Sequence, residues 1–270
     1  MSKNLFSSIF RKSSSTYYFA SLFFPKEVRE DVFILYAFVR TADNFVDELP
    51  QNVSGFERFV QETEQGFKYQ KSIDPIVNAF VKMAERRHVQ EKWVQDFFSA
   101  MRSDITTRTY HSYRDLEQYM YGSAEVVGLM MARILDVSKE GSRYAQTMGK
   151  AMQLINFIRD IQEDLRLGRV YIPEIDQKKY KVKYIPPHSK KEHGSFIRLI
   201  RYEILKYREL QLQVKKGFQY IPKQYRKPIM LASALYDWTA KEIYKNPMVV
   251  FEKKVKPSFF RVLFLFLFLR

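Results

Sequence analysis

The chain has 270 residues and a formal net charge of +15, from 45 Lys and Arg against 30 Asp and Glu. It contains no Cys, which excludes disulfides and thiolate metal sites, and its four His residues show no ligand spacing. Because no nucleic-acid-binding motif is present, we expect the positive charge to serve an anionic substrate or membrane surface rather than nucleic acid. This length allows a full core, and we expect one domain over residues 1–270.

The hydrophobic pattern predicts helices almost throughout. Apolar residues recur at helical spacing over six long stretches, at residues 26–48, 75–102, 114–135, 140–166, 194–218 and 224–245. No alternating strand pattern and no internal repeat is present. The segment 168–193 is the longest stretch that we expect to be non-helical, and we expect it to cover the mouth of a cavity. The predicted fold is all-α, with helices around a central cavity.

The predicted helix 26–48 carries two acids four residues apart. In LYAFVRTADNFVDE, Asp43 and Asp47 share an arc of about 60° with Tyr36 and Arg40, at roughly 100° per residue. Most acid pairs at this spacing are solvated and paired with nearby cations. Two such carboxylates on an otherwise apolar helix can instead bind a hard divalent cation such as Mg²⁺.

A second polar stripe lies on the predicted helix 140–166. In QLINFIRDIQEDLRLGRVYIP, Gln153, Asn156, Asp160 and Asp164 fall within an arc of about 80° that borders the apolar face. Two acidic helices that face each other would repel, and cations between them would relieve the repulsion. The two acid pairs together therefore favour a Mg²⁺ and diphosphate site over a solvated edge.

Five blocks in a fixed order resemble the squalene/phytoene synthase family, the head-to-head prenyl synthases. The resemblance covers residues 13–258, and its blocks are SSSTYYFASLFFP, YAFVRTADNFVDE, YMYGSAEVVGLM, the second acidic stretch with its GRVYIP continuation, and FEKKVKPS. The first three blocks are most similar to bacterial and archaeal phytoene synthases. The resemblance implies a single-domain isoprenoid synthase fold and an enzyme that uses Mg²⁺ or Mn²⁺.

The resemblance also implies roles for individual residues. The implied metal ligands, which belong to the catalytic set, are Asp43, Asp47, Asp160 and Asp164. The implied catalytic tyrosines that line the reaction centre are Tyr119 and Tyr236. The implied substrate-binding residues are Ser14, Thr16, Tyr17, Arg40, Gln153, Asn156, Arg159 and Lys254.

The chain departs from the family pattern in two places. Asn44 stands where many relatives have a second aspartate, and its amide cannot supply a carboxylate; we expect Asp43 and Asp47 to preserve metal binding. Lys253 and Lys254 stand where relatives often have an arginine-rich run, and lysine binds phosphate as a point charge without the guanidinium fork.

The resemblance implies condensation of two geranylgeranyl diphosphates to phytoene through a cyclopropylcarbinyl diphosphate. Two diphosphates leave, and NADPH is not expected. Aromatic residues make up 16% of the chain, which suits a carbocation that must be kept from water. The alternatives are a squalene or dehydrosqualene synthase that uses farnesyl diphosphate, and a non-catalytic assembly or lipid-surface protein. Retention of all four aspartates argues against the non-catalytic alternative.

The tail at residues 259–270 is basic and apolar. Its eight consecutive apolar residues from Val262 to Leu269 are too few to span a bilayer, which takes about 20 in a helix. We expect an interfacial anchor on anionic lipid, and the alternative is a tail that packs on the protein itself. The expected location is therefore cytoplasmic with peripheral membrane association, and downstream isoprenoid enzymes are candidate partners.

Overall fold

The computed structural model describes residues 2–13, 15–183 and 185–268, without the side chains of residues 2–4, 13 and 15–17. Its first elements are the α-helices α1 (Ser2–Ser13), α2 (Ser15–Ser21), α3 (Lys26–Asp47), α4 (Val53–Tyr69), α5 (Pro75–Arg86), α6 (Glu91–Thr106) and α7 (Tyr113–Met120). The π-helix η1 (Tyr121–Glu125) leads into α8 (Val126–Ile134), α9 (Lys139–Arg159), α10 (Ile161–Arg166), α11 (Glu174–Lys179) and α12 (Lys190–Gly217). The chain continues through the 3₁₀ turn η2 (Phe218–Tyr220), α13 (Lys223–Lys245), the 3₁₀ turn η3 (Pro247–Phe251) and α14 (Phe259–Phe268).

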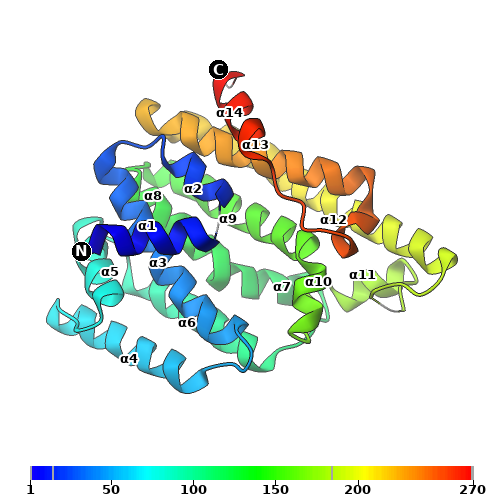
Figure 1. The fold of residues 1–270 in the computed structure, drawn as a ribbon, viewed down its shortest axis with the longest axis horizontal. Coiled ribbons are helices and arrows are strands. Elements are labelled where there is room, and N and C mark those ends of the chain that lie inside the picture. Colours follow the sequence, from blue (N-terminus) through cyan, green and yellow to red (C-terminus); the bar gives the residue numbers. More distant parts are fainter. Residues whose placement is uncertain (1, 14, 184, 269–270) are drawn as a thin grey trace.

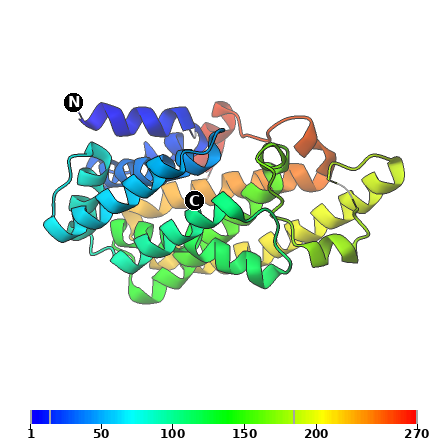
Figure 2. The ribbon, with the colours of Figure 1, turned by 90° about the horizontal axis from the view of Figure 1, so that it is seen from below.

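The long helices pack against one another around α3 and α9. Helix α9 contacts α8 and α12, while α3 contacts α1, α5 and α6 (Figure 1). Helix α1 lies along the outside of this bundle (Figure 2). Within the described ranges the helices are joined without a strand ladder, apart from an isolated bridge between Thr109 and Val170. The predicted all-α fold is confirmed.

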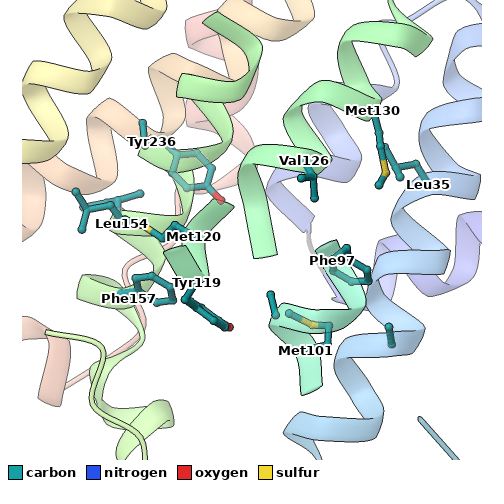
Figure 3. Close-up of a cluster of buried hydrophobic side chains, with 14 of the residues drawn as sticks. Leu35, Phe97, Met101, Tyr119, Met120, Val126, Met130, Leu154, Phe157 and Tyr236 are labelled. Carbon is teal, nitrogen blue, oxygen red and sulfur yellow. The ribbon is translucent and has the colours of Figure 1, made fainter. Parts of the chain in front are cut away.

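One hydrophobic core runs through the bundle. Its buried members extend from Phe6 in α1 to Val255 near the C-terminus. Aromatic rings fill much of it, and Phe38 of α3 stacks on Phe80 of α5 with ring centroids 3.6 Å apart. Each fully buried Phe contributes about 1.5–3 kcal/mol through removal of its surface from water. Figure 3 shows side chains of α6 facing those of α7 and α9 across this core.

Two of the predicted helices are interrupted. The stretch 75–102 forms two helices because the chain reverses after Arg86, where His88 adopts a left-handed φ of 53°. A single left-handed residue without Gly or Pro leaves no trace in the hydrophobic spacing. The stretch 140–166 breaks at Asp160, which ends α9 and begins α10. The expected non-helical segment 168–193 contains the short helix α11 and the start of α12.

Glycine allows α8 and α9 to approach closely. A Cβ atom at Gly149 of α9 would collide with the main-chain carbonyl of Ala124, and one at Gly128 of α8 would collide with that of Ala145. The π-helix η1, which contains Ala124, is part of this contact. The absence of side chains at two facing positions therefore sets the distance between the helices.

The C-terminal helix α14 has one buried side and one exposed side. Val262 is 3% exposed and packs with Ala20 of α2 and with Leu231 and Leu235 of α13. The outer residues of the helix are exposed; these are Phe259, Phe260, Leu263, Phe264, Leu267 and Phe268. The helix thus packs on the protein, as one alternative held, and still presents an apolar face. No helix in the described ranges is long and apolar enough to cross a membrane.

Candidate active site

The first acid pair lies near the end of α3. Asp43 and Asp47 are one helical turn apart, and Arg40 is close to Asp43, with Nη1 3.5 Å from Oδ2. Arg169 binds Asp47 directly, with Nη1 2.6 Å from Oδ1. Burial, followed by the charge of Asp47, raises the pKa of Asp43 to about 7. Burial and the neighbouring acid therefore disfavour the charged form of Asp43, although Arg40 and Arg169 lie close by.

The second acid pair lies at the break between α9 and α10. The main-chain N–H of Asp164 donates to the carbonyl of Asp160 at 2.9 Å; this bond forms the first turn of α10 and keeps the two acids on one side of it. Burial, followed by the charges of Asp160 and Asp47, raises the pKa of Asp164 to about 8. The charge of Asp47 acts on Asp164, which means that the structure brings the two predicted acid pairs together.

Asp160 differs from the other three acids because basic side chains surround it. Arg159 donates two hydrogen bonds to it, at 2.8 and 2.6 Å, and Lys254 lies 3.1 Å from Oδ1. Burial alone would raise the pKa of Asp160, but Arg159 and Lys254 outweigh it and hold the pKa below its ordinary value. Lys254 also binds Glu163. Two of the predicted diphosphate-binding residues thus lie directly on the second acid pair.

The acids of the site are of the chemical type that binds a hard divalent cation. Carboxylate oxygens are the ligands that Mg²⁺ prefers, and burial together with neighbouring acids, Asp47 among them, raises the pKa of both Asp43 and Asp164. The buried Oδ1 of Asn44 is also without a hydrogen-bond partner in the described part of the chain. Among the residues that the structure describes, no group of three or more Asp, Glu or His side chains is arranged so that it could hold a metal ion.

The two predicted tyrosines lie beside the acids. Tyr119 of α7 donates its hydroxyl hydrogen to Asp104 Oδ2 at 2.6 Å, and Tyr236 of α13 donates to Asn156 Oδ1 at 3.2 Å. Figure 3 shows Tyr119 beside Phe157, and Tyr236 further along the same side of the buried cluster, near Leu154 and Met120. Gln153, another predicted substrate residue, is half-buried on α9.

Three predicted substrate-binding residues lie outside the part that the structure describes. Ser14 is outside entirely, and the side chains of Thr16 and Tyr17 are outside as well. Their predicted role stays a prediction.

The structure adds three residues to the site. Arg169 and Tyr171 lie in the GRVYIP block. The sequence marks this block as part of the family pattern, but it does not predict a role for either residue. Asp104 of α6 is 3% exposed and accepts hydrogen bonds from Tyr119 and Tyr171. Nothing in the sequence around Asp104 marks it, because its partners come from other elements.

A pocket opens beside Asp164. Its lining is mainly apolar, with one acid and one arginine, and consists of Phe157, Ile161, Asp164, Leu165, Arg169, Val170, Tyr171, Ile172 and Ile185. Its volume is about 10 Å³, room for about one water molecule, so it marks an apolar wall beside one carboxylate and one guanidinium.

Comparison with known proteins identifies relatives along nearly the whole chain. Residues 10–261 match the family described as squalene/phytoene synthase. The chain is 24% identical to a 15-cis-phytoene synthase from Synechococcus elongatus over 258 residues, which cover 89% of this chain and 83% of that protein. It is 28% identical to the 15-cis-phytoene synthase of a Paracoccus species and 33% identical to a phytoene synthase from Thermus thermophilus. Those two matches cover 60% and 61% of this chain, and each covers 57% of the relative.

Solved structures share the fold. A dehydrosqualene synthase in complex with a ligand superposes with a TM-score of 0.89 at 24% identity, over 98% of this chain and 94% of that one. A squalene synthase from Alicyclobacillus acidocaldarius superposes with a TM-score of 0.79 at 20% identity, over 90% of this chain and 93% of that one. The bundle described above is therefore the isoprenoid synthase fold.

Proposed function

The chain belongs to the squalene/phytoene synthase family of prenyltransferases, and from this premise we propose that it condenses two geranylgeranyl diphosphates head to head to phytoene. The observation that carries the proposal is that Arg169 links the two acid pairs: its main-chain N–H donates to the carbonyl of Asp164 at 2.9 Å, and its Nη1 donates to Asp47 Oδ1 at 2.6 Å. Such a cluster suits the binding of diphosphate through Mg²⁺ or Mn²⁺. Residues 1–270 act as one catalytic domain in this proposal.

Asp43, Asp47, Asp160 and Asp164 would hold the divalent cations. When bound, the cations neutralise the diphosphate and make it a better leaving group. Arg40, Arg159 and Lys254 are placed at the edges of the acid cluster, where their charges can contact the outer phosphate oxygens. Gln153, Asn156, Ser14, Thr16 and Tyr17 complete the proposed substrate-binding set.

The apolar side of the site would protect the carbocation that remains after diphosphate leaves. Phe157, Tyr171 and the aliphatic residues of the pocket exclude water, and aromatic faces attract a cation. Burial raises the pKa of Tyr119 well above its ordinary value, so its hydroxyl stays neutral. The final proton loss needs only a nearby base, and the departed diphosphate or Tyr236 can serve.

The length of the prenyl diphosphate donor, C15 or C20, decides which hydrocarbon is formed. The phytoene synthases among the relatives favour the C20 donor and a product formed without NADPH. A second candidate, dehydrosqualene or squalene synthesis from the C15 donor, is favoured by the similarity in structure to a dehydrosqualene synthase. Both use the same cations and the same reaction type.

The experiment incubates the purified protein separately with farnesyl and geranylgeranyl diphosphate, each with and without NADPH and in the presence of Mg²⁺. The hydrocarbon is identified by mass spectrometry. We expect a C40 hydrocarbon from the C20 donor that does not depend on NADPH. A C30 product with no turnover of the C20 donor would establish the second candidate instead.

We also propose that the protein works at the cytoplasmic face of a membrane. The surface formed by Leu22 and Phe23, directly after α2, and by the exposed residues of α14 is apolar, and Phe23 stacks on Phe266 with centroids 3.6 Å apart. Lys227 and Arg261 lie at its edge. A hydrocarbon product has no place in water, so an interfacial position would let it pass into lipid or to a downstream isoprenoid enzyme.

A further inference from the structure

A buried acid outside the two acid pairs connects them to the aromatic part of the site. Asp104 comes from α6, whereas the pairs come from α3 and from the junction of α9 with α10. Each of its carboxylate oxygens accepts one hydroxyl group: Oδ2 from Tyr119 at 2.6 Å and Oδ1 from Tyr171 at 3.0 Å. Each oxygen of its side chain therefore binds a tyrosine from a different segment.

The main chain of Asp104 makes a second set of contacts. Its carbonyl oxygen accepts a hydrogen bond from Arg169 Nη2 at 2.9 Å. The same guanidinium donates through Nη1 to Asp47 Oδ1 at 2.6 Å. Asp104 thus fixes the tyrosines relative to the proposed metal-binding acids. Its carboxylate holds the two tyrosines, and its main-chain carbonyl holds Arg169, which binds Asp47.

Burying a carboxylate only to accept hydrogen bonds from two hydroxyl groups has a high cost in free energy. Removing its charge from water is unfavourable, and a neutral amide could also accept a hydrogen bond here. The charge of Arg169 is near, but the hydrogen bond of Arg169 goes to the carbonyl of Asp104 and not to its carboxylate. What a carboxylate adds is a shorter, stronger bond that draws the hydroxyl proton and leaves the phenolic oxygen more negative.

The two tyrosines lie where that negative charge can act on a substrate. The ring centroid of Tyr119 is 5.5 Å from that of Tyr171 and 5.9 Å from that of Phe157. Phe157 and Tyr171 stack with centroids 4.1 Å apart, and both line the pocket beside Asp164. A carbocation formed against the aromatic wall of Tyr119, Tyr171 and Phe157 would face rings whose electron density Asp104 increases.

We propose that Asp104 is a positioning residue of the prenyl transfer, which acts by orienting and polarising the hydroxyls of Tyr119 and Tyr171 beside the carbocation. This inference rests on the proposed function and deepens it. It predicts that Asp104 affects the chemical step more than the binding of diphosphate, because the metal-binding acids are held through its main chain.

The test compares Asp104→Asn with a matched control, Glu203→Gln. Glu203 of α12 is also a fully buried acid. Its partner Lys206 also binds Asp176, at 2.7 Å, so Lys206 still has an acidic partner in the variant. For Asp104→Asn we expect kcat to fall roughly 10- to 100-fold, with KM for the donor and the half-activating Mg²⁺ concentration within about twofold. For Glu203→Gln we expect kcat per folded molecule to stay within about twofold, whatever the change in Tm.

A double-mutant cycle shows whether Asp104 acts through Tyr119. If it does, Tyr119→Phe added to Asp104→Asn lowers kcat by no more than about a further twofold, because the polarised hydroxyl is already lost. An Asp104→Asn variant with the kcat of the wild type, or losses that multiply in the double variant, would overturn the proposal and leave the proposed function intact. A wild-type protein without turnover of either donor would overturn both.

Discussion

At the scale of single residues, the four predicted metal ligands do not share one electrostatic state. Asp160 is neutralised by Arg159 and Lys254, whereas Asp164 lies among other acids without a direct cationic partner among the described contacts. The folded state therefore holds a proton on Asp164 far more tightly than the unfolded chain does. This difference makes its contribution to stability depend on pH and on metal.

The first prediction concerns Asp164→Asn. Because folding raises the pKa of Asp164 from about 4 to about 8, its contribution to stability is fully present below about pH 4 and is lost as pH rises through about 8. In a chelator, the variant and the wild type should have similar Tm near about pH 4, and the variant should melt a few degrees higher near about pH 9. Scanning calorimetry at both pH values measures the difference.

Asp160→Asn is the matched control for that experiment. It removes an acid from an existing ion pair, so its Tm should fall at neutral pH instead of rising. Both variants should lose most turnover with Mg²⁺, because an amide cannot carry the charge that holds the cation. Equal Tm changes in the two variants would show that the acids are in equivalent surroundings.

The second prediction concerns Arg169, which is 3% exposed and binds Asp47 and two main-chain carbonyls. Lysine cannot reproduce the planar fork, so Arg169→Lys should lower the free energy of unfolding by about 1–3 kcal/mol. Arg102 offers a control, since it also binds a carboxylate with two hydrogen bonds but does so at the exposed surface. Arg102→Lys should cost less than about 1 kcal/mol in the same urea titration.

At the scale of helices, the third prediction tests the close contact between α8 and α9. Gly149→Ala adds a methyl group where the carbonyl of Ala124 already lies, so the helices must separate. We expect a loss of about 2 kcal/mol or more in stability. Gly194→Ala, at a helical position where the nearest atom is 3.7 Å away, should be neutral or should stabilise by up to about 1 kcal/mol. Similar behaviour of the two variants would contradict the tight packing.

The fourth prediction concerns the surface formed by α2 and α14. Phe260 and Phe264 are 80% and 57% exposed, so a Phe260→Ser/Phe264→Ser variant should fold normally and bind vesicles more weakly, by roughly tenfold or more. Co-sedimentation with vesicles of phosphatidylglycerol and phosphatidylcholine measures the binding, which added salt should also weaken. Ile73→Ser, at a residue 93% exposed and far from α14 in the sequence, is the control. Unchanged binding by the double variant would assign the apolar face to another role.

Local patterns explain what could be predicted and what could not. The acid pairs were predictable because a four-residue spacing places both side chains on one face of a helix, whatever the rest of the fold. Asp104 was not, because its partners lie 15 and 67 residues away and only the folded chain brings them to it. The break at Asp160 was missed for a related reason: the hydrophobic spacing continues across it, while the helix does not.

At the scale of the whole molecule, the fifth prediction links metal and substrate binding to stability. A ligand that binds only the folded state raises Tm according to its concentration and affinity. Mg²⁺ together with inorganic diphosphate should raise the Tm of the wild type by more than the sum of their separate effects, because each reduces the repulsion that opposes the other. Differential scanning fluorimetry with each alone and with both measures this. Strictly additive shifts would mean that the two bind at separate places.

The π-helix η1 has a consequence for the redesign of this fold. A π turn is equivalent to an α-helix with one residue inserted, and here it stands between Tyr119 in α7 and the close contact at Gly128 in α8. Deleting one residue from it would restore a regular helix, but it would also turn everything before the deletion by about 100° relative to α8. Tyr119 would then leave Asp104. The inserted residue thus lets Tyr119 reach Asp104 while Gly128 packs closely on α9, which one regular helix could not do. A redesign that made this segment a regular α-helix would keep the contact at Gly128 and lose the contact of Tyr119 with Asp104.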